Sequence, residues 1–190
     1  MAGGDVKKHD GMPRYIAFLR AINVGGRVVR MERLRELFAE IGCSKVETFI
    51  ASGNVIFESR VKSEAALQKR IETHLQKALG YEVGTFLRTD DELASVAAHR
   101  AFPEAKMVGG TVYVAFLAVE PSHAAAEALT SHRGEVDEFK IHGREVYWLC
   151  RKNFSDSEFS GSRLEKTLGM RTTVRNSTTV RKLVAKYPPT

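Results

Sequence analysis

The sequence predicts an α+β protein built from two tandem ferredoxin-like halves, each an antiparallel sheet with helices packed on one face. Short apolar segments rich in branched and aromatic residues alternate with longer segments in which apolar residues recur every three or four positions. These two periods are typical of strands and helices. The order βαββαβα occurs twice, which predicts a first half over residues 14–104 and a second over 105–190, ending in a C-terminal helix.

Residues 1–13, which read MAGGDVKKHDGMP, are expected to form a disordered tail outside the fold. No apolar run approaches the roughly 20 residues that are needed to span a bilayer. The beginning of the chain also has no apolar stretch of the signal-peptide kind. We therefore expect a cytoplasmic protein with no membrane contact.

The first half opens with a strand predicted over residues 15–22, which have the branched and aromatic side chains of a buried strand. A helix is predicted over 31–41, where apolar residues mark one face before a glycine. Strands over 46–51 and 55–58 follow. The Ser-Gly-Asn sequence between them is a strong turn signal and indicates a hairpin.

Capping signals predict the rest of the first half. Ser63 can cap a helix that extends to residue 79 and ends before a glycine. A strand is predicted over 83–88. Thr89 and Glu92 then have the spacing of a capping box, which opens a helix that a proline closes off after residue 99.

The second half repeats this order. A strand is predicted over 110–119, an alanine-rich helix over 122–132, and a hairpin with arms at 136–141 and 145–150. The same pattern of strand, helix and hairpin opens the first half, which indicates a duplication.

The end of the chain completes the second copy. Ser162 and Glu165 have the spacing of another capping box, which opens a short helix. Residues 171–174 predict a brief strand, and Asn176 can cap a last helix whose apolar residues share one face. These three elements correspond to the helix, strand and helix that close the first half.

The net charge of +6 is concentrated at the end of the chain. Residues 1–150 carry 20 Lys and Arg against 20 Asp and Glu, whereas residues 151–190 carry nine against three. A basic C-terminal segment favours an anionic partner, either a small molecule or a nucleic acid. The alternative is a solvated basic face that only raises the isoelectric point.

Cysteine and histidine spacing gives no sign of a metal or a cofactor. Cys43 and Cys150 are far apart and belong to no Cys-x-x-Cys pair, so we expect two buried, reduced thiols. The six His residues form none of the zinc-binding patterns. We predict no metal site and no cofactor.

The first candidate site follows the first strand. Arg20 interrupts an apolar segment and needs a partner, because burying an unpaired charge is very unfavourable. With Asn23 and the backbone amides of Gly25, Gly26 and Arg27, it can hold a phosphate or a carboxylate. The alternative is an internal salt bridge between Arg20 and a carboxylate.

The second candidate is the turn Ser52, Gly53 and Asn54, whose spacing is typical of a tight hairpin. A functional role requires the turn to lie beside the Arg20 loop. In the expected sheet we place these two segments at opposite ends of the strands. Both then serve one site only if the second half brings them together, which counts against a single simple pocket.

The third candidate precedes the last helix and consists of Arg171, Thr172, Thr173, Arg175 and Asn176. Two guanidinium groups, two hydroxyls and a helix start are well suited to an anion. The alternative is that the asparagine only caps the helix and that the arginines are solvated. No nucleophile elbow or nucleotide-binding glycine pattern occurs, so the sequence names no catalytic residue.

Together the three motifs resemble domain-of-unknown-function family 1697, an uncharacterised bacterial family. They stand here as R-A-I-N-V-G-G at 20–26, S-G-N-V-I-F at 52–57 and T-T-V-R-N-S-T-T-V at 172–180, and the resemblance covers about residues 14–187. It implies an α+β fold but no activity. It also implies one site shared by Arg20, Asn23, Ser52, Asn54, Arg175 and Asn176.

Two departures from the family pattern affect these motifs. Ala21 replaces the usual Gly after Arg20, and Ser177-Thr178 replace the usual Trp-Asn, which removes an aromatic ring that can stack on a ligand.

Four functions stay open. The first is a protein that binds a phosphate-bearing small molecule through Arg20, Arg171 and Arg175.

The second function is a nucleic-acid binder that uses the basic C-terminal surface. The third is an enzyme that acts on a phosphorylated metabolite, without a nameable base. The fourth is a structural or oligomeric module, which leaves all three motifs internally satisfied. The sequence does not predict the oligomeric state.

Overall fold

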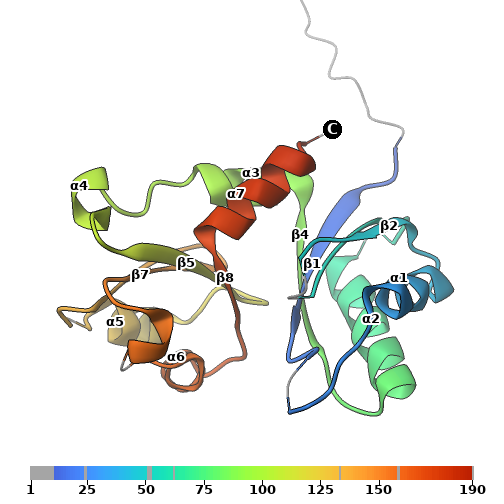
Figure 1. Ribbon diagram of the computed structural model, residues 1–190, viewed down its shortest axis with the longest axis horizontal. Coiled ribbons are helices and arrows are strands. Elements are labelled where there is room, and N and C mark those ends of the chain that lie inside the picture. The colour runs from blue at the N-terminus through green and yellow to red at the C-terminus, as the bar shows by residue number, and fades with distance from the viewer. Residues whose placement is uncertain are drawn as a thin grey trace, which may run out of the picture.

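A computed structural model describes residues 11–23, 25–50, 53–61, 63–132, 134–157 and 159–189. The chain folds into two four-stranded antiparallel sheets with helices on their outer faces and between them (Figure 1). This confirms the α+β class predicted from the sequence.

The first sheet has the strand order β2-β3-β1-β4. Its strands are β1 (Arg14–Arg20), β2 (Ser44–Thr48), β3 (Asn54–Glu58) and β4 (Gly84–Thr89). Helices α1 (Met31–Glu40) and α2 (Glu64–Leu79) cover the outer face of this sheet. Because side chains alternate along a strand, Ala17 and Leu19 of β1 point toward these helices while Ile16 and Phe18 point to the opposite face.

The second sheet has the matching order β6-β7-β5-β8. Its strands are β5 (Thr111–Phe116), β6 (Asp137–His142), β7 (Glu145–Cys150) and β8 (Thr173–Asn176). Helices α5 (His123–Thr130) and α6 (Gly161–Leu168) pack on its outer face, around the buried Trp148. A short helix, α4 (Glu104–Met107), and a 3₁₀ turn, η1 (Phe154–Asp156), complete the described elements.

The inner faces of the two sheets share one apolar core. Helices α3 (Asp90–Ala98) and α7 (Ser177–Lys186) lie side by side above this core, between the sheets (Figure 1). At its centre the ring of Phe18 from the first sheet stacks on that of Phe116 from the second, with centroids 4.0 Å apart and planes 11° apart. Each half therefore buries part of the other.

The order of elements agrees with the sequence prediction, and most boundaries differ by one to three residues. The first strand ends at Arg20 rather than residue 22, because Ala21 has a left-handed backbone with φ of 60°. The brief strand expected at 171–174 lies two residues later, at Thr173–Asn176. The four-residue α4 was not predicted from the sequence.

The capping box predicted at Ser162 is wrong. The cap of α6 is Ser160, whose side chain accepts a hydrogen bond from the backbone N–H of Arg163 at 3.2 Å. Glu165, the other half of the expected box, instead accepts hydrogen bonds from Arg20. The other predicted caps are confirmed: Ser63 caps α2, and α3 has a complete capping box.

Several chemical features of the chain bear on its function. Cys43 and Cys150 are buried and not disulfide-bonded. Across the part of the chain that the structure describes, no three His, Cys, Asp or Glu side chains gather in a way that suits a metal ion. None of the described helices combines the length and apolar content that crossing a membrane requires.

Candidate functional site

Arg20 forms the internal salt bridge that the sequence left open. Its Nε and Nη2 atoms donate to Glu165 Oε1 and Oε2 at 2.8 and 2.9 Å. Glu165 lies on α6 in the second half, and its Oε1 atom also accepts from the backbone N–H of Thr172 at 2.8 Å. The guanidinium of Arg20 therefore links the end of β1 to the segment that precedes β8.

The loop after Arg20 makes its contacts within the first half. Asn23 Oδ1 accepts a hydrogen bond from the backbone N–H of Val29 at 2.8 Å. Gly25 and Gly26 are exposed and have left-handed φ values of 68° and 80°. The Arg27 guanidinium lies 4.3 Å from the centre of the Tyr81 ring. This loop is an exposed surface feature beside the first sheet.

The hairpin turn lies next to this loop, so the expectation that the two segments occupy opposite ends of the sheet is wrong. Ser52 lies outside the described residues, but the Gly53 carbonyl accepts from the backbone N–H of Leu19 at 2.8 Å. A Cβ added to Gly53 would lie 2.8 Å from Ile22 Cγ2. The reason is that β1 and β3 are antiparallel, which places the end of β1 beside the start of β3.

Arg175 brings the third motif to the same place. Its side chain is buried between the halves, where Nε donates to Asn54 Oδ1 at 2.7 Å and Nη2 to the Leu19 carbonyl at 2.9 Å. Its Nη1 atom donates to Thr173 Oγ1 at 2.8 Å. Burial lowers the pKa of Arg175 to about 10, so the guanidinium is still charged at neutral pH.

The remaining residues of the third motif also have structural partners. Thr172 and Thr173 are buried, and the exposed Arg171 pairs with Glu82 at 2.9 Å. Asn176 caps α7 by accepting from the backbone N–H of Thr178 at 2.8 Å. The three motifs thus converge, and Arg20, Arg171 and Arg175 contact residues of the opposite half.

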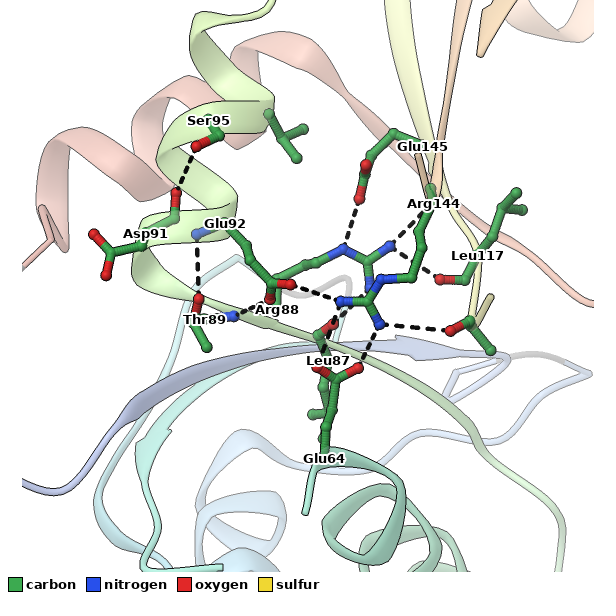
Figure 2. A network of polar contacts seen from close by, with 12 residues as sticks. Glu64, Leu87, Arg88, Thr89, Asp91, Glu92, Ser95, Leu117, Arg144 and Glu145 are labelled. Carbon is green, nitrogen blue, oxygen red and sulfur yellow. Dashed lines mark hydrogen bonds and ion pairs between the residues drawn. The ribbon is translucent and has the colours of Figure 1, made fainter. Parts of the chain in front are cut away.

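A second buried arginine, which the sequence analysis did not single out, extends from the first half to the second. Arg88 on β4 donates from Nε to Glu145 Oε1 at 2.6 Å, and from Nη2 to the carbonyls of Leu117 and Arg144 at 2.9 and 3.0 Å (Figure 2). Burial lowers the pKa of Arg88, and the carboxylate of Glu145 opposes this shift.

Arg144 extends this network to two helices of the first half. Its guanidinium binds the carboxylates of Glu64 on α2 and Glu92 on α3 (Figure 2). Glu92 is also part of the capping box that opens α3. The hairpin of the second sheet is therefore joined to the first half through side chains as well as through the shared core.

The contacts of Arg88 and Arg175 match one another. Each donates to the backbone carbonyl that follows a core phenylalanine of the opposite half. Each also lies over the ring of that phenylalanine, Arg88 at 5.4 Å from Phe116 and Arg175 at 5.7 Å from Phe18. We call Arg88 and Arg175 the reciprocal arginines. Each half thus receives the same kind of contact from the other, next to the stacked rings of Phe18 and Phe116.

A cavity lies under the segment that joins α3 to β5, and Ser177 and Val180 at the end of the third motif help to line it. We call this segment, residues 99–110, the linker. The cavity has a volume of about 840 Å³, within the range of small-molecule sites. Val112 and Val114 of β5 and Tyr147 of β7 form its floor, and Phe102 and Met107 of the linker form part of its roof. Its lining is thus mainly apolar.

Charged and polar groups surround this apolar cavity. Arg100 on the linker and Arg181 on α7 are both exposed, and Ser177 lines the cavity at the start of α7. Glu104 is the only carboxylate among the described lining residues. The rim therefore carries more positive than negative charge, which is the arrangement that attracts an anion with an apolar body.

A pair of stacked histidines includes one residue that lines the cavity, His99. His99 follows α3, and its ring stacks on that of His142 with centroids 4.4 Å apart and planes 13° apart. It also packs against Tyr147, whose ring centroid is 4.7 Å away. Burial and the neighbouring His142 both lower the pKa of His99.

Three cations of the basic C-terminal segment form ion pairs with different parts of the molecule. Arg151 pairs with Glu138, Arg171 with Glu82 and Lys186 with Glu47. These acidic partners come from β6, from the segment before β4 and from β2. These three cations are thus used in ion pairs, and no contact of the described residues favours a nucleic-acid interface.

Sequence reasoning missed the cavity because its parts are distant along the chain. Arg100 follows α3 and Arg181 lies on α7, and both line one cavity because α3 and α7 pack together. The one local signal was the change from helix to a proline-bearing linker after residue 99. That signal marks a connection and gives no indication of a ligand.

Comparisons with known proteins agree with the fold and give no activity. The family model described as "Protein of unknown function (DUF1697)" matches residues 12–147. No curated protein matches the chain. Among solved structures, the conserved bacterial protein SP0830 from Streptococcus pneumoniae is similar, with a TM-score of 0.70 and 21% sequence identity over 94% of this chain and 99% of that chain. This likeness concerns the fold alone.

Proposed function

The chain belongs to the family of proteins of unknown function DUF1697, and from that premise we propose that it is a binding protein for a small organic anion. The family description names no activity, so the proposal rests on the geometry of the chain. The ligand is a phosphate ester or a carboxylate. It lies in the cavity under the linker, and the cytoplasm is the proposed location, since two buried free thiols suit a reducing compartment.

The fold proposed with this function is a pair of tandem ferredoxin-like halves over residues 14–104 and 105–190. The same strand order in both sheets and the matching contacts of the reciprocal arginines support it. In this arrangement the linker connects the halves and also roofs the cavity. A ligand in the cavity thus contacts the segment that connects the two halves along the chain.

The observation that carries the proposal is an apolar cavity of about 840 Å³ with a basic rim. Val112 and Val114 offer an apolar floor, which favours a ligand with hydrocarbon or aromatic surface. Arg100 and Arg181 can each donate charged hydrogen bonds to an acid group at the rim. Arg181 contacts Thr178 Oγ1 at 3.3 Å on the exposed surface, so its guanidinium is not buried in a salt bridge.

The motifs first considered as a site have a different role in this proposal. Arg20 and Arg175 join the halves through Glu165, Asn54 and backbone carbonyls. Removing either side chain is expected to lower stability, whereas removing Arg181 is expected to lower anion binding and leave stability nearly unchanged. The loop with Gly25, Gly26 and Arg27 is the alternative place for an anion.

A thermal-shift screen of the purified chain against phosphate, sulfate, sugar phosphates, nucleotides and hydrophobic carboxylates tests the proposal. A ligand at roughly 100 times its dissociation constant raises the stability by about 2.7 kcal/mol. We expect one or more organic anions to raise the melting temperature. The increase should shrink in Arg100→Ala and Arg181→Ala and should persist in Lys182→Ala, a neighbouring exposed cation that does not line the cavity.

Three outcomes would contradict the proposal. The first is a ligand effect that survives in the Arg100→Ala/Arg181→Ala double variant. The second is loss of the effect in Arg27→Ala, which would move the anion to the loop after β1. The third is stabilisation by oligonucleotides alone, falling by orders of magnitude between roughly 50 and 200 mM salt, which would indicate a nucleic-acid binder.

A further inference from the structure

The matching contacts of the reciprocal arginines give the strand residues of the cavity, and those of α7, counterparts in the other half. Arg88 on β4 is paired in the sheet with Ile16 of β1, and Arg175 on β8 is paired with Val114 of β5. Since the reciprocal arginines make matching contacts, these two pairs occupy equivalent positions. The strands and helices that continue from them can then be compared residue by residue.

The residues two positions away along the chain from these pairs differ between the halves. Two residues before the paired position, β1 carries Arg14 where β5 carries Val112. Two residues after the reciprocal arginines, α3 begins with Asp90 where α7 begins with Ser177. A charged pair in the first half thus corresponds to an apolar and a neutral polar residue in the second.

In the first half this place is occupied by the side chains themselves. The Nη1 atom of Arg14 lies 3.6 Å from Oδ2 of Asp90 and donates to the Pro188 carbonyl at 3.0 Å. Asp90 is only 7% exposed, and its Oδ1 atom accepts from the backbone N–H of Asp91 at 3.1 Å. A guanidinium, its aliphatic stem and a carboxylate therefore fill the space between β1, α3 and the end of α7.

In the second half the equivalent place is hollow. Val112 and Ser177 both line the cavity under the linker, and the first turn of α7 carries no acidic residue. Valine is shorter than arginine, so the space that the stem of Arg14 takes in the first half has no counterpart side chain. The carboxylate of Asp90 also has no counterpart, while Arg100 and Arg181 add positive charge at the rim.

We infer that the ligand of this cavity is an acid with a compact apolar body, whose acid group takes beside Ser177 the place that Asp90 takes in the first half. This inference rests on the proposed function and names its ligand class. The acid group lies between Ser177, Arg181 and Arg100, and the apolar body lies on Val112 and Val114. An inorganic anion lacks the surface to cover this floor, and an uncharged ligand does not neutralise the two arginines.

Isothermal titration of the full chain with phenylacetate, 2-phenylethanol and acetate separates the two parts of the ligand. The alcohol keeps the ring but has no charge, and acetate keeps the charge but has no ring. We expect phenylacetate to bind about tenfold or more tightly than either, since each missing part removes roughly 1.4 kcal/mol or more. Phenyl phosphate against inorganic phosphate gives the same comparison for a phosphate head.

A matched pair of substitutions at the start of α7 tests the position of the acid group. Ser177→Asp introduces the carboxylate that Asp90 provides at the equivalent position of the first half. Ser177→Asn introduces a side chain of the same size as Asp but without charge. We expect Ser177→Asp to weaken phenylacetate binding by about tenfold or more through like-charge repulsion. Ser177→Asn should bind phenylacetate within about threefold of the unsubstituted chain.

The double variant Val112→Arg/Ser177→Asp rebuilds the ion pair of the first half and should fill the cavity, so that phenylacetate binding is lost. Retained far-ultraviolet circular dichroism and a cooperative melt show that it is folded. Ser177→Asp alone keeps the test decisive if the double variant does not fold. Unchanged phenylacetate binding in Ser177→Asp would overturn the inference.

The outcomes distinguish this inference from the proposed function. If inorganic phosphate and phenyl phosphate bind equally well and both depend on Arg181, the anion-binding function stands and the apolar body is wrong. If phenylacetate and 2-phenylethanol bind equally well, or if binding ignores Arg100 and Arg181, both proposals are wrong. Binding of phenylacetate that requires Arg181 and is weakened by Ser177→Asp supports both.

Discussion

At the scale of single residues, two buried arginines link the halves, and their environments differ. Arg88 faces the carboxylate of Glu145, whereas the Nε atom of Arg175 donates to the neutral amide oxygen of Asn54. Burial lowers the pKa of both guanidinium groups. The consequence of losing each arginine therefore depends on what it leaves behind.

We predict that Arg88→Met is more destabilising than Arg175→Met. The first leaves the carboxylate of Glu145, which is 7% exposed, without its charge partner, and such losses cost about 3–5 kcal/mol. The second removes hydrogen bonds to neutral groups, which costs about 1–3 kcal/mol. Denaturant unfolding measures both. Arg171→Met, which breaks an exposed pair, is the control and should cost less than about 1 kcal/mol.

Ala21 provides a second prediction at this scale. Its φ of 60° is a left-handed conformation, which costs an L-residue about 1–2 kcal/mol and glycine almost nothing. Ala21→Gly should therefore stabilise the chain, by about 0.5–1 kcal/mol after the extra entropy of glycine in the unfolded state is subtracted. Thermal unfolding measures the change, and Ala17→Gly inside β1 should be destabilising.

The third prediction at this scale concerns pH. Because the pKa of His99 is lowered in the folded chain, the unfolded chain binds more protons below about pH 6.5, and stability should fall as the pH drops through that region. His142→Phe removes one of the two causes and should raise the pKa of His99. Nuclear magnetic resonance titration of the His99 ring checks this. An unchanged or lower pKa in the variant would contradict it.

At the scale of elements, the sequence predicted what is local and failed where two local signals competed. The capping box at Thr89 and the glycine after α2 were read correctly, because the residues involved are close along the chain. At the start of α6, both Ser160 and Ser162 are residue types that cap helices, and the sequence alone favoured the wrong one. The glutamate that completed the expected box is used by Arg20, from the other half.

The cap of α6 gives a prediction with a built-in control. Ser160→Ala removes the acceptor for the backbone N–H of Arg163 and should cost about 1 kcal/mol. Ser162→Ala leaves that hydrogen bond in place and should change stability by less than about 0.5 kcal/mol. Urea unfolding of the two variants side by side checks the order. A larger loss in Ser162→Ala would contradict the position of the cap.

At the scale of the whole molecule, the shared core makes the two halves one cooperative object. The inner faces of both sheets meet at Phe18 and Phe116, and α3 and α7 close over the same core. The division into two halves describes the chain order. Each half covers apolar surface of the other half that would otherwise be exposed to water.

We expect the chain to unfold in a single calorimetric transition, with equal calorimetric and van't Hoff enthalpies. Phe116→Ala should lower the stability by about 3–5 kcal/mol and reduce amide protection in β1 of the first half as well as in β5. Hydrogen exchange read out by residue measures both effects. A loss of protection confined to the second half would show that the halves unfold separately.

The long-range contacts explain why the candidate site was harder to predict than the fold. Strand and helix periods gave the element order, and family motifs marked Arg20, Asn54 and Arg175 as important. Their partners lie far along the chain: Glu165 is 145 residues from Arg20, and Asn54 is 121 residues from Arg175. Charge and spacing identified residues that need a partner. That each partner is another residue of the protein, and not a ligand, follows only from the way the two halves pack.

The hydrogen bond from Arg14 to the Pro188 carbonyl brings the beginning of the first strand beside the end of the last helix (Figure 1). A circularly permuted chain, in which residues 13 and 189 are joined by a few glycines and new termini are opened in the linker, would keep both sheets and the reciprocal arginines. The covalent order of the halves is thus exchangeable. What the permuted protein would lose is the unbroken roof over its cavity, which makes permutation a way to study ligand entry without altering a side chain.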